Sequence, residues 1–216
     1  ALSGGLVGSE MCIRDRCIGA YTDSSLYGSE GEVIPDDTDL AGYDKHKLHS
    51  QGGCLLLIFD RKRLDDLGDV YFSFADGRTR ASRRVLHSTF AAEAQAAVET
   101  YGLAKYYRAY ICDILLGYAD WRDVAYGDAE LPIVMFTDCK SLYDSLKKDG
   151  SVPDDKWIAV PVASLRGAVS AGVGRNKTKS ECRWVPSRWQ LADCLTKKGF
   201  AADFKTKGLE IQASIL

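Results

Sequence analysis

The sequence predicts an α/β fold, and two features of its pattern carry that prediction. Leu131–Phe136 is an apolar run that ends in Thr137 and Asp138, which is typical of a strand buried on both faces of a sheet. Phe90–Leu116 instead places apolar side chains at helical spacing, so we expect the longest helix there. Along the chain we expect three strands, the long helix, a strand, a short helix, a second helix, a strand and a final helix.

The composition is that of one globular domain. The chain has 216 residues, of which 46% are hydrophobic and 27% charged, and this fits one well-filled domain better than two. Its seven cysteines form no CxxC pair and have no ligand-like spacing with the three histidines, so neither a disulfide framework nor a zinc site is indicated. A reducing, intracellular compartment fits this cysteine usage. No apolar run approaches the ~20 residues that span a bilayer, so no membrane association is expected.

Charge is distributed unevenly along the chain. The formal net charge is only −2, but Tyr21–Asp60 is acidic and Lys140–Gly208 is rich in lysine and arginine. This distribution allows a nucleic-acid partner and does not require one.

The first residues do not look like part of a folded domain. Leu6–Asp15 has no helical or strand period, and it resembles the translation of a transposase adapter used in preparing sequencing libraries. We therefore expect residues 1–16 to be a disordered assembly artefact, to be left out of fold reasoning. The genuine reading frame would then be truncated upstream, so that a preceding domain could be missing.

Three strand-like runs precede the long helix, at Cys17–Asp23, Gly52–Asp60 and Asp69–Phe74. Between the first two, Ser24–Ser50 is rich in Gly, Asp, Ser and Glu, which predicts a long surface connection. A short charged turn joins the later two runs, which favours an antiparallel meander. A basic connection to the long helix is expected at Arg78, Arg80, Arg83 and Arg84.

The long helix has an N-cap signal at Ser88 and Thr89. The elements after the buried strand are expected as a short helix, a helix, a strand and a helix, at Cys139–Lys148, Asp154–Ala171, Glu181–Pro186 and Gln190–Lys198. Pro161 must kink or restart the second of these helices. One domain over residues 17–200 and a tail over residues 201–216 follow from this order.

Four acids occupy comparable places on these elements: Asp23 on the first strand, Glu93 in the first turn of the long helix, Asp138 at the end of the buried strand and Asp193 in the last helix. Each has an ordinary structural explanation, such as helix capping for Asp138 or a favourable helix dipole for Glu93. Neither capping nor solvation requires all four to occur together and in this order. Ligands of open α/β sheets bind beyond the carboxyl ends of the strands, which makes Asp138 a functional candidate.

At this point the sequence resembles the ribonuclease H fold, and more closely the ribonuclease H domain that closes the polyprotein of copia-type LTR retrotransposons. The segments that carry the resemblance are Ala20–Asp23, Val85–Gln95, Pro132–Asp138 and Trp184–Lys197. The last is the most specific, because a strand, a Val-Pro turn and Leu-Ala-Asp-x-Leu-Thr-Lys look like that family and little else. The resemblance covers nearly everything from Cys17 to Gly199.

The resemblance implies a mixed five-stranded sheet, with three antiparallel strands followed by two parallel ones and helices on both faces. It implies that the four acids converge on two Mg²⁺ ions, for which Mn²⁺ could substitute. Asp23 and Asp138 would hold both metal positions, Glu93 the leaving-group side, and Asp193 the metal that activates water. Carboxylates packed this closely should have one or more raised pKa values until metal binds.

The implied activity is hydrolysis of the RNA strand of RNA/DNA hybrids during reverse transcription. Discrimination would come from the 2′-hydroxyls and the groove width of the hybrid, with little base specificity. The implied partners are the hybrid and an upstream reverse transcriptase domain of the same polyprotein. The implied locations are the cytoplasmic particle of the element and the nucleus.

Four residues are candidates for contacts to the substrate: Ser88, Thr89, Lys140 and Arg188. Ser88 and Thr89 would touch phosphates of the DNA strand, although N-capping explains them equally well. Lys140 stands where copia-type relatives often have a glutamine that faces the minor groove, and it could contact a phosphate instead.

The chain departs from some ribonucleases H because no histidine lies beyond His87. The role of a mobile histidine before the last acid is then empty, or is supplied by Lys177, Lys179 or Arg188. The tryptophans Trp157, Trp184 and Trp189 are expected in the core, with stacking on nucleic acid as an alternative for Trp189.

Two other functions stay open from the sequence. The chain could be a catalytically silent ribonuclease-H-like module that binds hybrid or braces a reverse transcriptase, although the presence of all four acids argues against this. It could also be another nuclease of the same fold, such as an integrase or resolvase core, against which the Leu-Ala-Asp-x-Leu-Thr-Lys segment speaks.

Overall fold

The computed structural model describes residues 16–26, 50–65, 72–82, 86, 88–116, 131–148, 153–170 and 180–196. The disorder expected at the N-terminus, most of the acidic connection and the tail at 201–216 lie outside the described residues. Arg16 is the exception at the N-terminal boundary, because it is paired with Asp60 in the sheet and so is not disordered.

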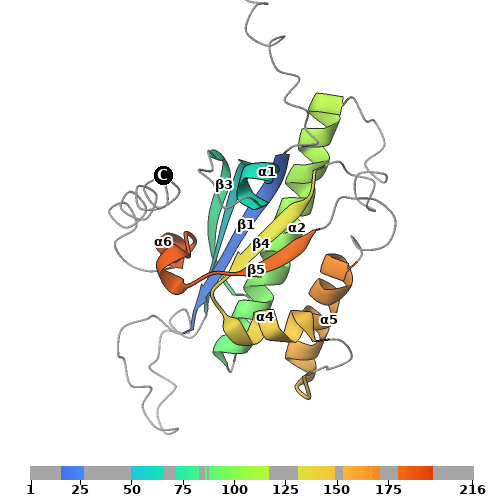
Figure 1. Cartoon of the computed structure of the whole chain (residues 1–216). Coiled ribbons are helices and arrows are strands. Elements are labelled where there is room, and N and C mark those ends of the chain that lie inside the picture. Colours follow the sequence, from blue (N-terminus) through green and yellow to red (C-terminus); the bar gives the residue numbers. More distant parts are fainter. Residues whose placement is uncertain are drawn as a thin grey trace, which may run out of the picture.

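A mixed five-stranded sheet forms the centre of the described part (Figure 1). Its strands are β1 (Arg16–Ser25), β2 (Gln51–Asp60), β3 (Phe72–Ala81), β4 (Ile133–Thr137) and β5 (Glu181–Trp184). They lie in the order β3-β2-β1-β4-β5. β2 is antiparallel to both β1 and β3, whereas β4 is parallel to both β1 and β5. The predicted fold class, an α/β fold whose mixed five-stranded sheet has three antiparallel strands and then two parallel ones, is confirmed.

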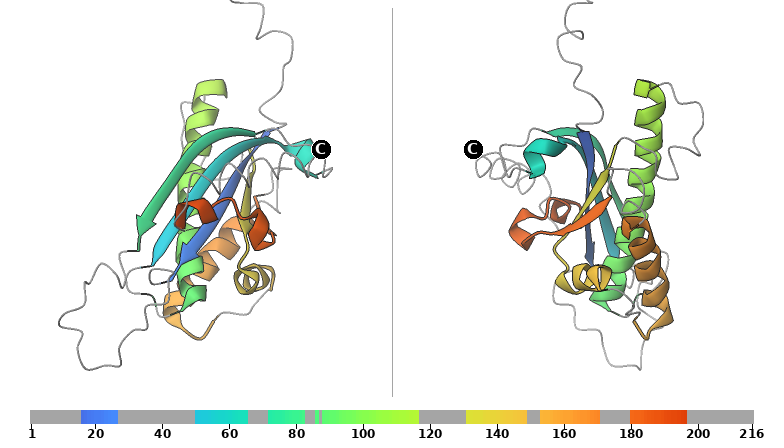
Figure 2. Two further views of the ribbon diagram at one scale, coloured as in Figure 1. Left: turned by 90° about the vertical axis from the view of Figure 1, so that its left-hand side faces the viewer. Right: turned by 45° about the vertical axis from the view of Figure 1, so that its right-hand side comes forward.

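Helices cover both faces of this sheet, as expected. They are α1 (Arg61–Asp65), α2 (Thr89–Leu116), α4 (Lys140–Lys147), α5 (Lys156–Ser170), the 3₁₀ turn η5 (Ser187–Trp189) and α6 (Asp193–Thr196). Helix α2 runs along one face with α4 and α5 beside it, and α6 lies against the other face (Figure 2). None of the described helices is long and apolar enough to span a membrane.

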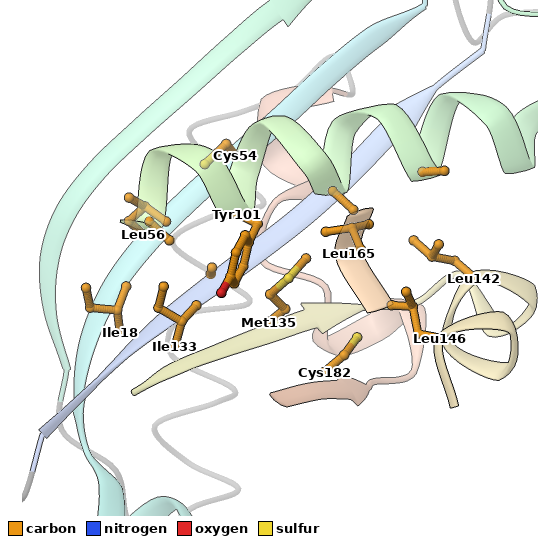
Figure 3. Close-up of a cluster of buried hydrophobic side chains, with 14 of the residues drawn as sticks. Ile18, Cys54, Leu56, Tyr101, Ile133, Met135, Leu142, Leu146, Leu165 and Cys182 are labelled. Atoms are coloured by element: carbon orange, nitrogen blue, oxygen red, sulfur yellow. The ribbon is translucent and has the colours of Figure 1, made fainter. Parts of the chain in front are cut away.

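The alternation of side chains along the strands divides the core into two layers. On β1, Ile18 and Ala20 pack toward α2, whereas Cys17 and Tyr21 belong to the apolar cluster on the other face, where α6 lies. The layer under α2 also contains Leu56, Ile133 and Met135 of the neighbouring strands (Figure 3). Because successive residues of a strand point to opposite faces, each apolar strand supplies both layers, which is why these strands read as continuous apolar runs.

Two elements differ from the sequence prediction. β3 continues to Ala81, so Arg78 and Arg80 belong to a strand and not to a basic connection. The pairing of β3 with the long strand β2 supplies hydrogen-bond partners that no local pattern reveals. The second difference is α1, a short helix after β2 that was expected as a turn.

The C-terminal helices also differ in detail from their predicted bounds. α5 continues through Pro161 without restarting. The last helix begins at Asp193 and not at Gln190, because a 3₁₀ helix and a turn at 191–192 precede it. Trp157 and Trp184 are 67% and 42% exposed, so their expected place in the core is wrong, whereas Trp189 packs partly buried against the layer under α6.

Replacing Gly19 of β1 by alanine should create a packing defect that can be measured. A Cβ on Gly19 would lie 2.0 Å from Cε2 of Phe59, whose ring is 4% exposed and packs edge-on against Phe72 and Phe136. Because that ring has no room to move, Gly19→Ala should lower the free energy of unfolding by about 1–3 kcal/mol. Urea denaturation would measure this loss, and the m value of the variant should equal that of the parent chain.

The matched control is Gly102→Ala in α2, where an added Cβ meets nothing within 4 Å. This change should raise stability by about 0.5–1 kcal/mol, because alanine loses less conformational entropy in a helix. A Gly19→Ala variant as stable as the parent chain would contradict the packing argument.

Candidate active site

Asp23 and Asp138 are brought together by the parallel pairing of β1 with β4. The register places Tyr21 opposite Phe136. Asp23 follows Tyr21 by two residues, and Asp138 follows Phe136 by two residues. Two residues is the repeat of a strand, so both side chains leave the sheet at its carboxyl edge on the same face. This face is the one that α6 covers.

Asp193 reaches the same place from the C-terminal part of the chain. It is the first residue of α6, which packs on β1 and β2. Asp23, Asp138 and Asp193 each offer one carboxylate oxygen such that the three oxygens lie within 4.8 Å of one another. Asp23 and Asp193 are buried, and Asp138 is half-buried. We refer to these three residues as the acid cluster.

Glu93 approaches the acid cluster from the opposite face, on α2. It is the fifth residue of that helix and not part of its first turn, so the expected placement in the first turn is wrong by one position. Its Oε1 accepts a hydrogen bond of 3.1 Å from the backbone N–H of Ser24, which follows Asp23. Its Oε2 is buried and has no hydrogen-bond partner within the described residues.

The environment of Glu93 raises the pKa of its carboxyl from 4.5 to about 8. Burial is the largest cause, the charge of Asp23 comes next, and the charge of Asp138 adds a smaller effect. The expectation that an acid of this group has a raised pKa is confirmed for Glu93, although desolvation exceeds like-charge repulsion. Because the charges of both Asp23 and Asp138 act on Glu93, this residue lies beside the acid cluster.

Helix capping does not account for Asp138. The N-cap of α4 is Cys139, and the Cys139 N–H donates to Oγ1 of Thr137. Asp138 therefore lies one residue before the position at which a side chain would cap the helix.

The four candidate substrate contacts lie at three places. Ser88 accepts a 3.1 Å hydrogen bond from the Ala91 N–H through its Oγ, which is the bond of an N-cap, and Thr89 is exposed at the start of α2. Lys140 is exposed and its Nζ lies 2.8 Å from Oδ1 of Asp144. Arg188 is on η5, and its Cζ lies 5.4 Å from the centroid of the Trp189 ring. Lys177 and Lys179 lie outside the described residues.

Trp184 is a residue of this region that sequence reasoning missed. Its indole Nε1–H donates a 2.9 Å hydrogen bond to the backbone carbonyl of Asp138, and Nζ of Lys140 lies 5.8 Å from its ring centroid. Trp184 is the register partner of Thr137, which precedes Asp138, so its side chain lies beside the end of β4. A Trp-Val-Pro sequence marks the strand end but not the side to which the ring points.

The donor set of this site fits a hard divalent cation. Carboxylate oxygens are the preferred ligands of Mg²⁺ and Mn²⁺, and several buried acids in one small volume repel each other unless protons or cations neutralise them. The buried Oε2 of Glu93, which has no hydrogen-bond partner in the described part of the chain, is a further oxygen available to such an ion. Asp23, Glu93, Asp138 and Asp193 are therefore the residues that could hold metal.

Comparisons with known proteins give structural likenesses to several solved chains, two of which follow. One is ribonuclease H1 of the halophilic archaeon Halobacterium salinarum, with a TM-score of 0.45 and 11% identity over 86% of this chain and 98% of that one. The other is LC11 ribonuclease H1, isolated from compost by a metagenomic approach, with a TM-score of 0.46 and 12% identity over 86% of this chain and 96% of that one. No protein-family model and no curated protein matches the chain. The fold assignment rests on the order and direction of the strands themselves.

The raised pKa of Glu93 predicts how the stability of the metal-free protein changes with pH. Between its unfolded value of 4.5 and its folded value of about 8, the folded state binds one more proton than the unfolded state. Stability should therefore fall as pH rises through this window, and the full cost of the buried charge is present above it. Glu93→Gln should remove this dependence and be more stable above the window, by roughly 1–3 kcal/mol.

Urea unfolding at a series of pH values in EDTA would measure the effect. Glu99→Gln is the matched control, because Glu99 is exposed on the same helix and bonds only Gln95 in the described part of the chain. Stability curves of the Glu93→Gln variant and the parent chain that run parallel from pH 5 to pH 9 would contradict the assigned shift.

Proposed function

We propose that this chain is a metal-dependent endonuclease that hydrolyses the RNA strand of RNA/DNA hybrids. The observation that carries the proposal is the acid cluster at the carboxyl edge of β1 and β4, with Glu93 beside it, on a ribonuclease-H-like sheet. Phosphodiester hydrolysis requires a water made nucleophilic and a leaving oxygen that is stabilised. A buried group of carboxylates at the open edge of a sheet suits both needs once it holds cations.

In this proposal Asp23, Glu93, Asp138 and Asp193 hold two Mg²⁺ ions, for which Mn²⁺ can substitute. The bound ions would supply the activation of water and the stabilisation of the leaving oxygen. Asp23 and Asp138 serve both positions, Glu93 the leaving-group side and Asp193 the side of the attacking water. The burial of Asp23, Glu93 and Asp193 keeps bulk water from competing for their oxygens. Glu93 must give up the proton that its raised pKa retains before its carboxylate can serve as a ligand.

The substrate contacts proposed for Ser88, Thr89, Lys140 and Arg188 are contacts to phosphates. The ammonium group of Lys140 is exposed and pairs with an exposed Asp144, so it can exchange that partner for a phosphate at small cost. Contacts to phosphate hold a duplex in register without reading its bases, and the 2′-hydroxyls then distinguish RNA from DNA.

The proposed biological context is reverse transcription of a copia-type LTR retrotransposon. The Leu-Ala-Asp-x-Leu-Thr-Lys segment supports it, and an upstream reverse transcriptase domain would be the partner. The proposed domain covers residues 17–200, with residues 1–16 as an artefact and 201–216 as a tail. The corresponding locations are the cytoplasmic particle and the nucleus.

Cleavage of a labelled RNA/DNA hybrid by the full chain with Mg²⁺ or Mn²⁺ tests the activity, beside matched RNA and DNA duplexes. Asp138→Asn should lower the rate by at least about 100-fold, because even groups that only support metal ligands cost 10- to 100-fold when changed. Asp154→Asn, at an exposed acid before α5, should leave the rate unchanged. Hybrid binding without cleavage by the parent chain would instead favour a silent module.

Lys140→Gln tests the phosphate contact separately from the chemistry. The variant should bind hybrid more weakly, and the slope of log affinity against log salt should decrease by about 1, because one phosphate contact is lost. Lys62→Gln, exposed on α1 next to the start of β1 and so at the other end of the strands, is the control that should leave the slope as it is. An unchanged salt slope for Lys140→Gln would exclude the contact.

A further inference from the structure

The segment before α6 is anchored on β1 next to Asp23. The pairing of β1 with β4 ends at Tyr21, and the backbone carbonyl of the next residue, Thr22, accepts a 2.8 Å hydrogen bond from Nε2 of Gln190. Gln190 is completely buried, so this bond is shielded from water. The chain that leads into α6 is therefore attached one residue before the acid of β1.

A glycine allows α6 to approach the sheet at this point. Gly53 of β2 is the register partner of Asp23. A Cβ at Gly53 would lie 2.8 Å from Cγ2 of Thr196 and 3.1 Å from the carbonyl oxygen of Ala192. Any larger residue would push α6 outward, away from the strand that carries Asp23.

The close approach places the hydroxyl of Thr196 between two members of the acid cluster. Its Oγ1 donates a hydrogen bond to Oδ2 of Asp23, and the same oxygen lies 3.3 Å from the carbonyl oxygen of Asp193. A hydroxyl has one proton, and the shorter contact to the carboxylate takes it. The methyl group of the same side chain packs over Gly53. The hydroxyl and the methyl group of Thr196 therefore both make contacts with the sheet.

We propose that Thr196 is a positioning residue, which holds the Asp23 carboxylate in the orientation that the acid cluster needs to bind a divalent cation. Two buried carboxylates repel each other, and the hydrogen bond from Thr196 opposes the rotation of the Asp23 side chain away from Asp193. The hydrogen bond to Oδ2 of Asp23 restricts that rotation and joins β1 to α6, whose first residue is Asp193. The inference rests on the proposed function only in taking the acid cluster as a metal site.

Calorimetric titration of the full chain with Mn²⁺ at neutral pH tests this role without any nucleic acid. Thr196→Val keeps the shape and the methyl contact to Gly53 but removes the donor, whereas Thr196→Ser keeps the donor and removes the methyl. We expect Thr196→Val to bind Mn²⁺ about 10- to 100-fold more weakly, the range found when a partner that orients a metal ligand is removed. Thr196→Ser should bind nearly as tightly as the parent chain.

Gly53→Ala provides a second, independent variant. It leaves the hydroxyl in place but moves α6 outward, so it should also weaken Mn²⁺ binding, whereas Gly102→Ala on α2 should not. Circular dichroism and thermal unfolding in EDTA show whether each variant is folded. If Thr196→Val does not fold, the comparison of Thr196→Ser and Gly53→Ala with the parent chain decides the question.

Equal Mn²⁺ affinity of Thr196→Val and the parent chain would overturn the proposal, as would equal losses in Thr196→Val and Thr196→Ser. Cleavage of hybrid separates this outcome from a failure of the proposed function. A chain whose Mn²⁺ affinity depends on the Thr196 hydroxyl but which leaves hybrid intact would retain the positioning role and lose the assigned substrate. A parent chain that binds no divalent cation would overturn both.

Discussion

The parallel pairing of β1 with β4 is the constraint on which the candidate site depends. It brings the carboxyl ends of two strands to one edge and sets Asp23 and Asp138 on one face. Residues 26–132 lie between those two strands and include β2, β3 and α2, so the pairing joins segments that are far apart in the sequence. The apolar layers under α2 and α6 supply the burial that stabilises this arrangement.

Bringing several acids together in a buried place opposes folding, and the structure offsets this cost locally. The Ser24 N–H donates to Glu93, and the Thr196 hydroxyl donates to Asp23. The raised pKa of Glu93 shows that it retains a proton near neutral pH, which removes one charge from the group. A cation bound here would replace that proton and relieve the remaining repulsion, so that folding, protonation and the proposed metal binding would be coupled at one site.

Much of the fold and of the site could be predicted because it depends on local patterns. Apolar runs mark β1, β2 and β4, helical periodicity marks α2 and α5, and each of the four acids occurs at a recognisable place on such an element. The resemblance of Trp184–Lys197 to one family added the direction of the last strands. The full extent of β3 was missed because an edge strand that carries Arg78 and Arg80 on exposed positions has no apolar alternation to reveal it.

By itself, the sequence determined the order of the elements and the identity of the acids, since periodicity and residue type are properties of neighbouring residues. Only the tertiary structure decided which side chains meet at the site. Thr196 and Asp23 are 173 positions apart, and Gly53 matters only because α6 packs against it. Trp184 likewise reaches Asp138 across 46 positions. Such contacts arise from strand register and helix packing, and no local pattern of the sequence contains them.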